Sequence, residues 1–135
     1  MIGLVCGGRN FGTEVICAQP APAKKQITFF EKSLVHLHSI YSFSVIVSGG
    51  AKGADTLAIQ WANLNGLELK VFMADWKRHG TGAGPVRNQR MIDEARPDIT
   101  IAFAGGRGTL DMINRSYTNG VKVIDLREFY KDSSE

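Results

Sequence analysis

Short apolar runs alternate with longer amphipathic runs along this 135-residue chain. The apolar runs have the length of buried strands, and Phe43–Val47 and Ile99–Phe103 are typical of them. They predict five strands, at residues 2–7, 43–48, 67–74, 98–104 and 121–126. In the third of these strands we expect Val71 and Phe72 to be buried.

Between the strands, apolar residues recur three and four positions apart, which is the spacing of a helix with one buried face. This pattern predicts helices at residues 24–41, 54–65, 85–95 and 108–118. We expect the following side chains of the second and fourth helices to point toward a core: Leu57, Ala58, Trp61, Ala62, Leu64, Leu110, Ile113 and Tyr117. Residues 8–23 and 75–84 are predicted loops, and Pro85 suits the first position of the third helix.

The alternation of strands and helices predicts parallel strands that are joined by right-handed crossovers. We therefore expect an α/β fold, a doubly wound Rossmann-like three-layer domain with a mainly parallel five-stranded sheet. The length suits a single domain over residues 1–135, with a polar tail at 127–135.

Two glycine-rich turns, 48–55 and 105–111, each follow a predicted strand and precede a predicted helix. Glycine lets backbone N–H groups approach a ligand oxygen, and the helix start adds unpaired N–H groups and a positive dipole end. Gly7-Gly8 and the glycines of 80–84 fall at the same edge of the sheet. Ligands of such sheets bind at the carboxyl ends of the strands, so the turns indicate a crevice for phosphate or a nucleotide.

Composition indicates an ordinary soluble protein, with 44% hydrophobic residues, 21% charged residues and a net charge of +3. Like charges form no block, and no apolar run approaches the roughly 20 residues of a membrane span. The first residues lack a basic leader, so we expect a cytoplasmic protein without membrane contact. Cys6, Cys17 and the histidines lack the spacing of metal ligands, so we expect no metal site and a buried, reduced Cys6.

Two common nucleotide motifs are not matched. The chain has no Gly-x-x-x-x-Gly-Lys-Ser/Thr segment, which disfavours a P-loop NTPase. Residues 82–87 begin like a dinucleotide fingerprint, but Arg87 stands at the third glycine position. The sequence therefore gives little support to NAD-dependent hydride transfer.

The order of five short segments resembles the YspA-like branch of the SLOG (SMF/DprA–LOG) superfamily of Rossmann-like nucleotide-binding domains. The segments are Cys6–Phe11, Ser48–Asp55, Ala74–Trp76, Ala83–Met91 and Ala102–Thr109. The resemblance covers about residues 2–126 and implies binding of a nucleotide or nucleotide-derived ligand without a further cofactor. It also implies a homodimer, for which Trp61, Phe29 and Tyr41 are candidate interface residues.

Some members of the superfamily, the LOG enzymes, cleave the base from a nucleoside monophosphate. Their Pro-Gly-Gly-x-Gly-Thr-x-x-Glu signature works with an arginine that matches Arg87, and its glycines and threonine match Gly105, Gly106, Gly108 and Thr109. Met112 stands at the position of the glutamate, and methionine cannot activate water. The neighbouring Asp111 points about 100 degrees away from that position on a helix.

Several candidate residues have two interpretations. Arg9 and Arg87 can clamp a phosphate or form surface salt bridges, and Trp76 can stack on a base or cover the end of the sheet. Asp55 can cap its helix, hold a ribose hydroxyl or act as a base. Ser48 and Thr109 can donate hydroxyls to phosphate or cap their own helices.

We expect a sensor or sequestering module for a nucleoside phosphate or an ADP-ribose-type molecule. One alternative is an N-glycosidic hydrolase or transferase that uses Asp55 or Asp111. Another is a single-stranded nucleic-acid binder like DprA domains, which the modest charge and few exposed aromatic candidates disfavour. The candidate ligand-binding residues are Gly7, Gly8, Arg9, Ser48, Gly49, Gly50, Gly53, Asp55, Trp76, Gly84, Arg87, Asn88, Gly105, Gly106, Gly108 and Thr109.

Overall fold

A five-stranded, all-parallel sheet organises the protein, whose computed structural model describes residues 1–13 and 20–131. The strands lie in the order β3-β2-β1-β4-β5, so β1 is central and the order reverses between β1 and β4. Their bounds are β1 Ile2–Cys6, β2 Val45–Ser48, β3 Glu68–Val71, β4 Ile99–Phe103 and β5 Lys122–Leu126. The predicted Rossmann-like α/β fold is confirmed.

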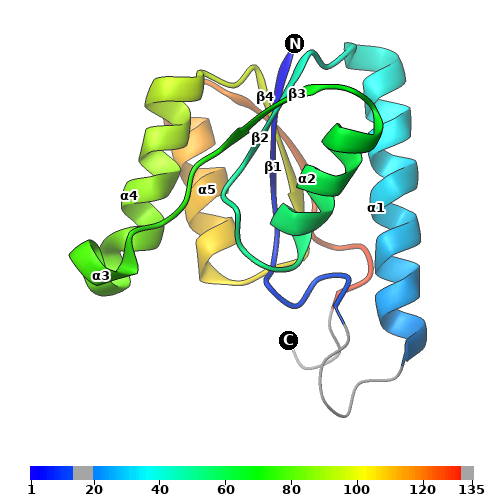
Figure 1. Cartoon of the computed structure of the whole chain (residues 1–135), viewed down its shortest axis with the longest axis horizontal. Coiled ribbons are helices and arrows are strands. Elements are labelled where there is room, and N and C mark those ends of the chain that lie inside the picture. The colour runs from blue at the N-terminus through cyan, green and yellow to red at the C-terminus, as the bar shows by residue number, and fades with distance from the viewer. Residues whose placement is uncertain (14–19, 132–135) are drawn as a thin grey trace.

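Helices cover both faces of this sheet (Figure 1). One face carries α1 (Pro20–Tyr41) and α2 (Ala54–Leu64), and the other carries α4 (Ala83–Arg90) and α5 (Arg107–Thr118). The remaining helical segments are α3 (Trp76–His79), a 3-10 turn η1 (Gly80–Gly82) and a π-helical turn η2 (Met91–Ala95). The two helical layers therefore make a three-layer arrangement around the sheet.

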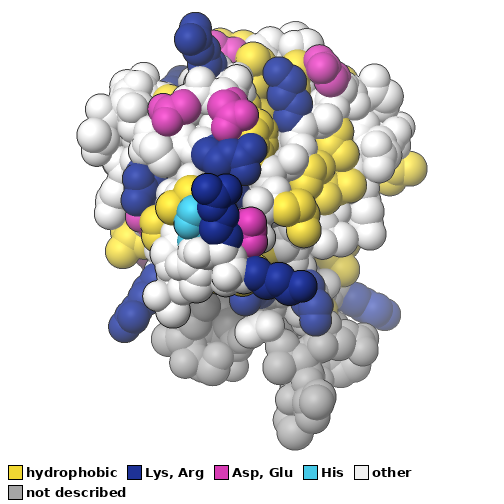
Figure 2. Space-filling model, turned by 60° about the vertical axis from the view of Figure 1, so that its left-hand side comes forward, with side chains coloured by type: hydrophobic (Ala, Val, Ile, Leu, Met, Phe, Trp, Pro, Cys, Tyr) yellow, Lys and Arg dark blue, Asp and Glu magenta, His cyan; other side chains and the backbone are white. Residues whose placement is uncertain are grey.

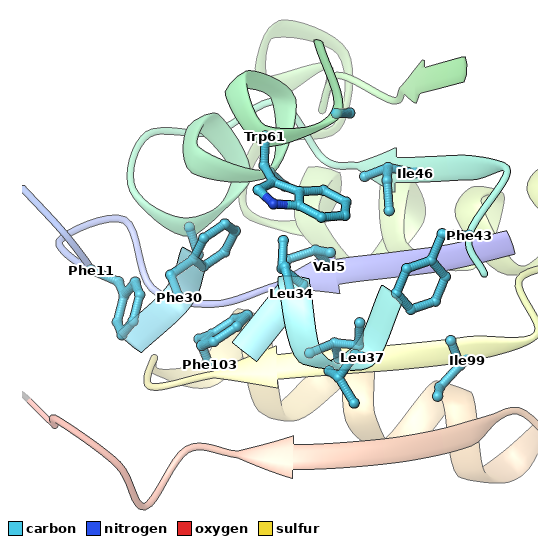
Figure 3. Close-up of a cluster of buried hydrophobic side chains, with 14 of the residues drawn as sticks. Val5, Phe11, Phe30, Leu34, Leu37, Phe43, Ile46, Trp61, Ile99 and Phe103 are labelled. Atoms are coloured by element: carbon cyan, nitrogen blue, oxygen red, sulfur yellow. The ribbon is translucent and has the colours of Figure 1, made fainter. Parts of the chain in front are cut away.

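Each face of the sheet has its own hydrophobic core. The core under α1 and α2 contains aromatic side chains, among them Phe30, Phe103 and Trp61 (Figure 3). Trp61 is only 5% exposed, so it packs inside the fold. The core under α4 and α5 is built from smaller aliphatic and sulfur-containing side chains, including Met91 and Met112. This second core lies directly beneath the site described below.

Four apolar side chains that we expected to be buried are exposed instead. Leu64 is 85% exposed and Tyr117 63%, and Leu110 and Val71 are also exposed. The buried face of α5 is a different one, formed by Thr109, Met112, Ile113 and Ser116. Val71 is exposed because β3 is an edge strand, and α2 turns Leu64 away from the sheet.

The predicted loop at 75–84 is wrong, because the structure is helical from Trp76 onward. The Asp75 side chain begins this helical stretch by accepting a hydrogen bond from the N–H of Arg78 at 3.1 Å. Helix α1 begins at Pro20, earlier than predicted, and proline is compatible with a first turn because N–H groups there have no helical partner. Cys17, residues 14–19 and the end of the tail, 132–135, lie outside the described residues.

Candidate functional site

A cavity of about 630 Å³ lies at the carboxyl ends of the strands, where the strand order reverses between β1 and β4. This is the position where open α/β sheets bind ligands. The turns after β1 and β4, the start of α2 and the α3–α4 region surround it. Its lining is Cys6, Gly7, Gly8, Arg9, Asn10, Ala51, Asp55, Trp76, Thr81, Gly84, Pro85, Arg87, Asn88, Met91, Gly106, Arg107, Gly108, Thr109, Asp111 and Met112.

Most of the residues singled out from the sequence meet at this cavity. Those that line it are Gly7, Gly8, Arg9, Asp55, Trp76, Gly84, Arg87, Asn88, Gly106, Gly108, Thr109 and Asp111. The candidate residues that do not line it are Ser48, Gly49, Gly50, Gly53 and Gly105. Ser48 is fully buried, and its hydroxyl donates to the Asp55 carbonyl oxygen at 3.0 Å and accepts the Gly50 N–H. Ser48 therefore holds its own turn together.

The turn after β1 joins the two glycine-rich turns. The N–H of Gly8 donates to the carbonyl oxygen of Ala104 at 2.8 Å, and the carbonyl oxygen of Gly8 accepts the N–H of Ala54 at 3.2 Å. A Cβ atom at Gly53 would collide with the Gly8 carbonyl oxygen, so the backbones are in close contact there. The three turns are thus fixed relative to one another by backbone contacts.

Arg87 of α4 spans the cavity toward the turn after β2. Its Nη1 donates to the Gly49 carbonyl oxygen, and its Nε donates to the Asn88 side chain at 3.0 Å. Burial lowers the pKa of Arg87, and the nearby Asp55 carboxylate raises it in part. Because an arginine side chain carries five N–H donors, this arrangement leaves others for a ligand.

Asp55 lies in the first turn of α2 and is only 7% exposed. Its Oδ2 accepts the N–H of Ala51 at 3.1 Å. Burial raises the pKa of Asp55 to about 6, while the bond from Ala51 and the charges of Arg87 and Arg9 act in the opposite direction. Burial, and then the neighbouring Asp55, also raise the pKa of the Cys6 thiol, which stays protonated at neutral pH.

Asp111, the other candidate carboxylate, is held by neighbouring side chains. Its Oδ2 accepts from Arg115 Nε at 2.7 Å and from Asn88 Nδ2 at 2.9 Å. Arg115 also donates to Gln89 of α4. Asp111 therefore ties α5 to α4. The adjacent Met112 is 1% exposed and forms part of the cavity wall.

The mouth of the cavity carries a positively charged group and an aromatic ring. The Arg9 guanidinium carbon lies 5.1 Å from the centre of the Trp76 ring, and Trp76 is 48% exposed. Figure 2 turns the α3–α4 side of the molecule forward and shows Lys and Arg side chains through the middle of this face. A cation over an aromatic ring is a favourable contact, and both groups remain accessible to a ligand.

The N-terminus of α5 opens onto the same cavity. Its N-cap is Gly106, and no side chain caps this helix start among the described residues. Arg107, Gly108 and Thr109 supply the first N–H groups of the helix, which have no partner within it. Free N–H groups and the positive end of a helix dipole are the features that suit an anion.

The sequence interpretation missed several lining residues. Arg107 has a visible signal, because it is a charged residue inside a glycine-rich turn at a helix start. The sequence carries no such signal for Met91 and Asn10, since each lines the cavity only because of the way its segment packs in the fold. The Asp111–Arg115 pair also has a signal, because side chains four residues apart on a helix are neighbours.

The parallel sheet with its reversed strand order and its cavity at that reversal define a Rossmann-like α/β domain. The chain belongs to the YspA, cpYpsA-related SLOG family, whose family model matches residues 2–79. Membership indicates a nucleotide-related domain. Of the segments that carry the resemblance, 83–91 and 102–109 lie beyond the matched range.

The chain also has a relative among known proteins. The chain is similar to the Gene 61 protein of Mycobacterium phage D29, with 34% identity over 110 residues. This match covers 76% of the chain and 87% of the phage protein. Within the described residues, no helix is both long and apolar enough to cross a membrane.

Proposed function

We propose that this protein binds a nucleotide or a nucleotide-derived phosphorylated ligand in the cavity and acts as a sensor or sequestering module. The observation that carries the proposal is the uncapped N-terminus of α5, which opens onto a cavity lined by Arg9, Arg87 and Arg107. A nucleoside phosphate or an ADP-ribose-type molecule has the two parts that this lining suits, a phosphate and a base.

The phosphate binds at the start of α5. There the N–H groups of Arg107, Gly108 and Thr109 are free of helical partners, and the dipole favours a negative charge. Arg87 adds a charged donor whose orientation is set by its bond to the Gly49 carbonyl oxygen. Charge-assisted hydrogen bonds of this kind are stronger than neutral ones, so they dominate the affinity.

The base binds at the mouth, against Trp76. An exposed indole ring offers a stacking surface for any base, and Arg9 already lies over this ring. The wall deeper in the cavity is apolar, with Met91, Met112 and the protonated Cys6. This supports a ligand with a charged end and an uncharged aromatic end.

The charges of the lining also favour an anion. Three arginines face two carboxylates, and one of these, Asp111, is neutralised by Arg115 outside the lining. The remaining carboxylate, Asp55, forms no ion pair with a described residue. The excess positive charge therefore suits a ligand with one or more phosphate groups.

Binding is favoured over the LOG-type cleavage of a nucleoside monophosphate. That reaction needs a carboxylate where this chain has Met112, and the carboxylate of Asp111 is held by Arg115 and Asn88. We expect no release of free base from nucleoside monophosphates. Release that Asp55→Asn abolishes would favour the enzymatic alternative.

Thermal unfolding in the presence of a nucleotide panel tests the proposal. The panel contains nucleoside mono- and diphosphates, ADP-ribose, inorganic phosphate and unphosphorylated nucleosides. A ligand at 100 times its Kd adds about 2.7 kcal/mol of stability, which raises the Tm by several degrees. If no phosphorylated nucleotide raises the Tm, the proposed function is wrong.

Two variants of α4 connect the result to the site. Arg87→Ala removes a cavity-lining donor, and we expect the affinity for the nucleotide to fall about ten- to a hundredfold. Arg90→Ala is the matched control, because Arg90 is exposed, pairs with Glu94 and does not line this cavity. Equal affinities of the two variants would contradict the assignment of Arg87.

A further inference from the structure

Asp55 presents one carboxylate oxygen to the cavity without a partner. Oδ2 accepts the Ala51 N–H, whereas no hydrogen bond to Oδ1 is formed by the described residues. Every fully enclosed side-chain nitrogen or oxygen in the described part of the chain has a partner. Oδ1 is therefore accessible, and since Asp55 lines the cavity, this oxygen is accessible from there.

A buried carboxylate oxygen without a hydrogen-bond partner is energetically unfavourable. Asp55 is more than nine-tenths buried, and the charged and titratable groups near it are Arg87 of α4, Arg9 of the β1 turn and Cys6 of β1. None of them forms an ion pair with it. An ionised carboxylate can only accept hydrogen bonds, so a ligand that displaces water from this oxygen leaves it unsatisfied unless the ligand supplies a donor.

The neighbourhood of Asp55 indicates which donor. A Cβ atom at Gly49 would lie 2.9 Å from Asp55 Oδ2 and would also collide with Arg87 Nη1, so the carboxylate and the guanidinium flank the same backbone position. The proposed anion-binding arginine and the hydroxyl-accepting carboxylate are thus neighbours. In a nucleotide the sugar joins the phosphate to the base, so the ribose hydroxyls lie nearer to the phosphate than the amino groups of the bases do.

We propose that Asp55 accepts a hydrogen bond from a ribose hydroxyl and makes the cavity selective for ribonucleotides over nucleotides that lack both the 2′- and the 3′-hydroxyl. This inference rests on the proposed nucleotide-binding function and adds the class of sugar to it. Asp55 is then a specificity-determining residue that contacts the ligand. A hydroxyl donor to a charged acceptor is worth about ten- to a hundredfold in affinity.

The test compares two sets of ligands with the purified full chain. The ligands are the adenosine, guanosine, cytidine and uridine 5′-monophosphates and their 2′,3′-dideoxy counterparts, with affinities measured by titration calorimetry. For the wild type we expect ribonucleotides to bind about ten- to a hundredfold more tightly than dideoxynucleotides. Equal affinities would overturn this inference and leave nucleotide binding intact, whereas no binding by any nucleotide would overturn both proposals.

Variants assign the preference to Asp55. In Asp55→Ala we expect the ribose preference to disappear, because ribonucleotides lose affinity while dideoxynucleotides do not. Asp55→Asn keeps the shape and the bond to Ala51 but puts an NH2 donor in the place of Oδ1, so the charged acceptor is lost and the ribose preference should fall; this variant serves if the alanine variant does not fold. Asp93→Asn, which removes an exposed carboxylate outside the cavity, is the control that keeps the preference.

Two results would overturn the assignment. One is a ribose preference that persists in both Asp55 variants, because another group would then recognise the hydroxyl. The other is equal binding of ribo- and dideoxynucleotides together with an Asp55-dependent preference for adenine, cytosine and guanine over uracil. That second result would mean that Asp55 accepts from an amino group of the base.

Discussion

The glycine-rich turns after β2 and β4 are similar in sequence but differ in how their polar groups are used. Both precede a helix whose N-cap is a glycine without a side-chain cap. In the turn at 48–55 the backbone groups are engaged, because Ala51 N–H bonds to Asp55, the Gly49 carbonyl bonds to Arg87 and Ala54 N–H bonds to Gly8. In the turn at 105–109 the first N–H groups of α5 face the cavity.

The space around the glycines shows the same difference. A Cβ atom would collide with neighbouring atoms at Gly49 and Gly53, and in the other turn at Gly105, whereas Gly106 and Gly108 have nothing within 4 Å of such an atom. Glycine therefore serves close packing in the turn after β2, while the turn after β4 packs closely at Gly105 and is open at Gly106 and Gly108. Similar sequences at two helix starts do not imply the same role in binding.

Gly53→Ala, in the turn after β2, is expected to change the free energy of unfolding the most. Gly53 has φ +78 and ψ −128, a conformation that essentially only glycine adopts, and its Cβ would collide with the Gly8 carbonyl oxygen. Strain and overpacking together are expected to cost about 3 kcal/mol of the free energy of unfolding. Urea unfolding followed by circular dichroism measures this loss.

Gly108→Ala is the matched change in the other turn. Because Gly108 is helical and its Cβ would meet open space, we expect the free energy of unfolding to rise by about 0.5–1 kcal/mol. The new methyl group is tilted toward the helix start and so toward the cavity, which weakens phosphate binding. If Gly53→Ala were tolerated as well as Gly108→Ala, the turns would not differ as described.

The contribution of Asp55, at the end of the turn at 48–55, to the free energy of unfolding is expected to depend on pH. The pKa of Asp55 rises from 3.8 in the unfolded chain to about 6 in the fold, so the folded state holds its proton more tightly. Its contribution to stability is fully present below pH 3.8 and is lost as the pH rises through 6, a change of about 3 kcal/mol. Urea unfolding between pH 4 and pH 7.5 measures it.

Asp55→Asn is the control for this pH dependence. The amide has no charge to bury, so the free energy of unfolding of the variant relative to the wild type should increase from pH 4 to pH 7. A constant difference between Asp55→Asn and the wild type would contradict the effect of burial on Asp55.

The sequence predicted the five strands, the helices α1, α2, α4 and α5 and the edge of the sheet at which the glycines gather, because hydrophobic period and turn residues are local properties. It did not predict the buried face of α5, since Leu110 and Tyr117 fit a helical stripe as well as Met112 and Ser116 do. It also did not separate Asp55 from Asp111. That difference depends on Arg115, Asn88 and the depth of each carboxylate, which only the packed fold defines.

A change at Trp76 sharpens the comparison when it is tested with a ligand that has no base. Stacking on an aromatic side chain contributes about 1–3 kcal/mol, so Trp76→Ala should weaken nucleotide binding about tenfold. Binding of ribose 5-phosphate should not change, because its phosphate depends on the open turn at 105–109. Calorimetric titrations of both ligands measure the two affinities.

Fluorescence gives an independent readout of the same contact. The chain has two tryptophans, and Trp61 is buried in the core while Trp76 is exposed at the cavity mouth. A stacked base should quench the emission of the wild type but not of Trp76→Phe, and ribose 5-phosphate should quench neither. If Trp76→Ala lowered the affinities for the nucleotide and for ribose 5-phosphate equally, Trp76 would instead support the structure of the cavity mouth. Binding of the phosphate would then not depend on the turn at 105–109 alone.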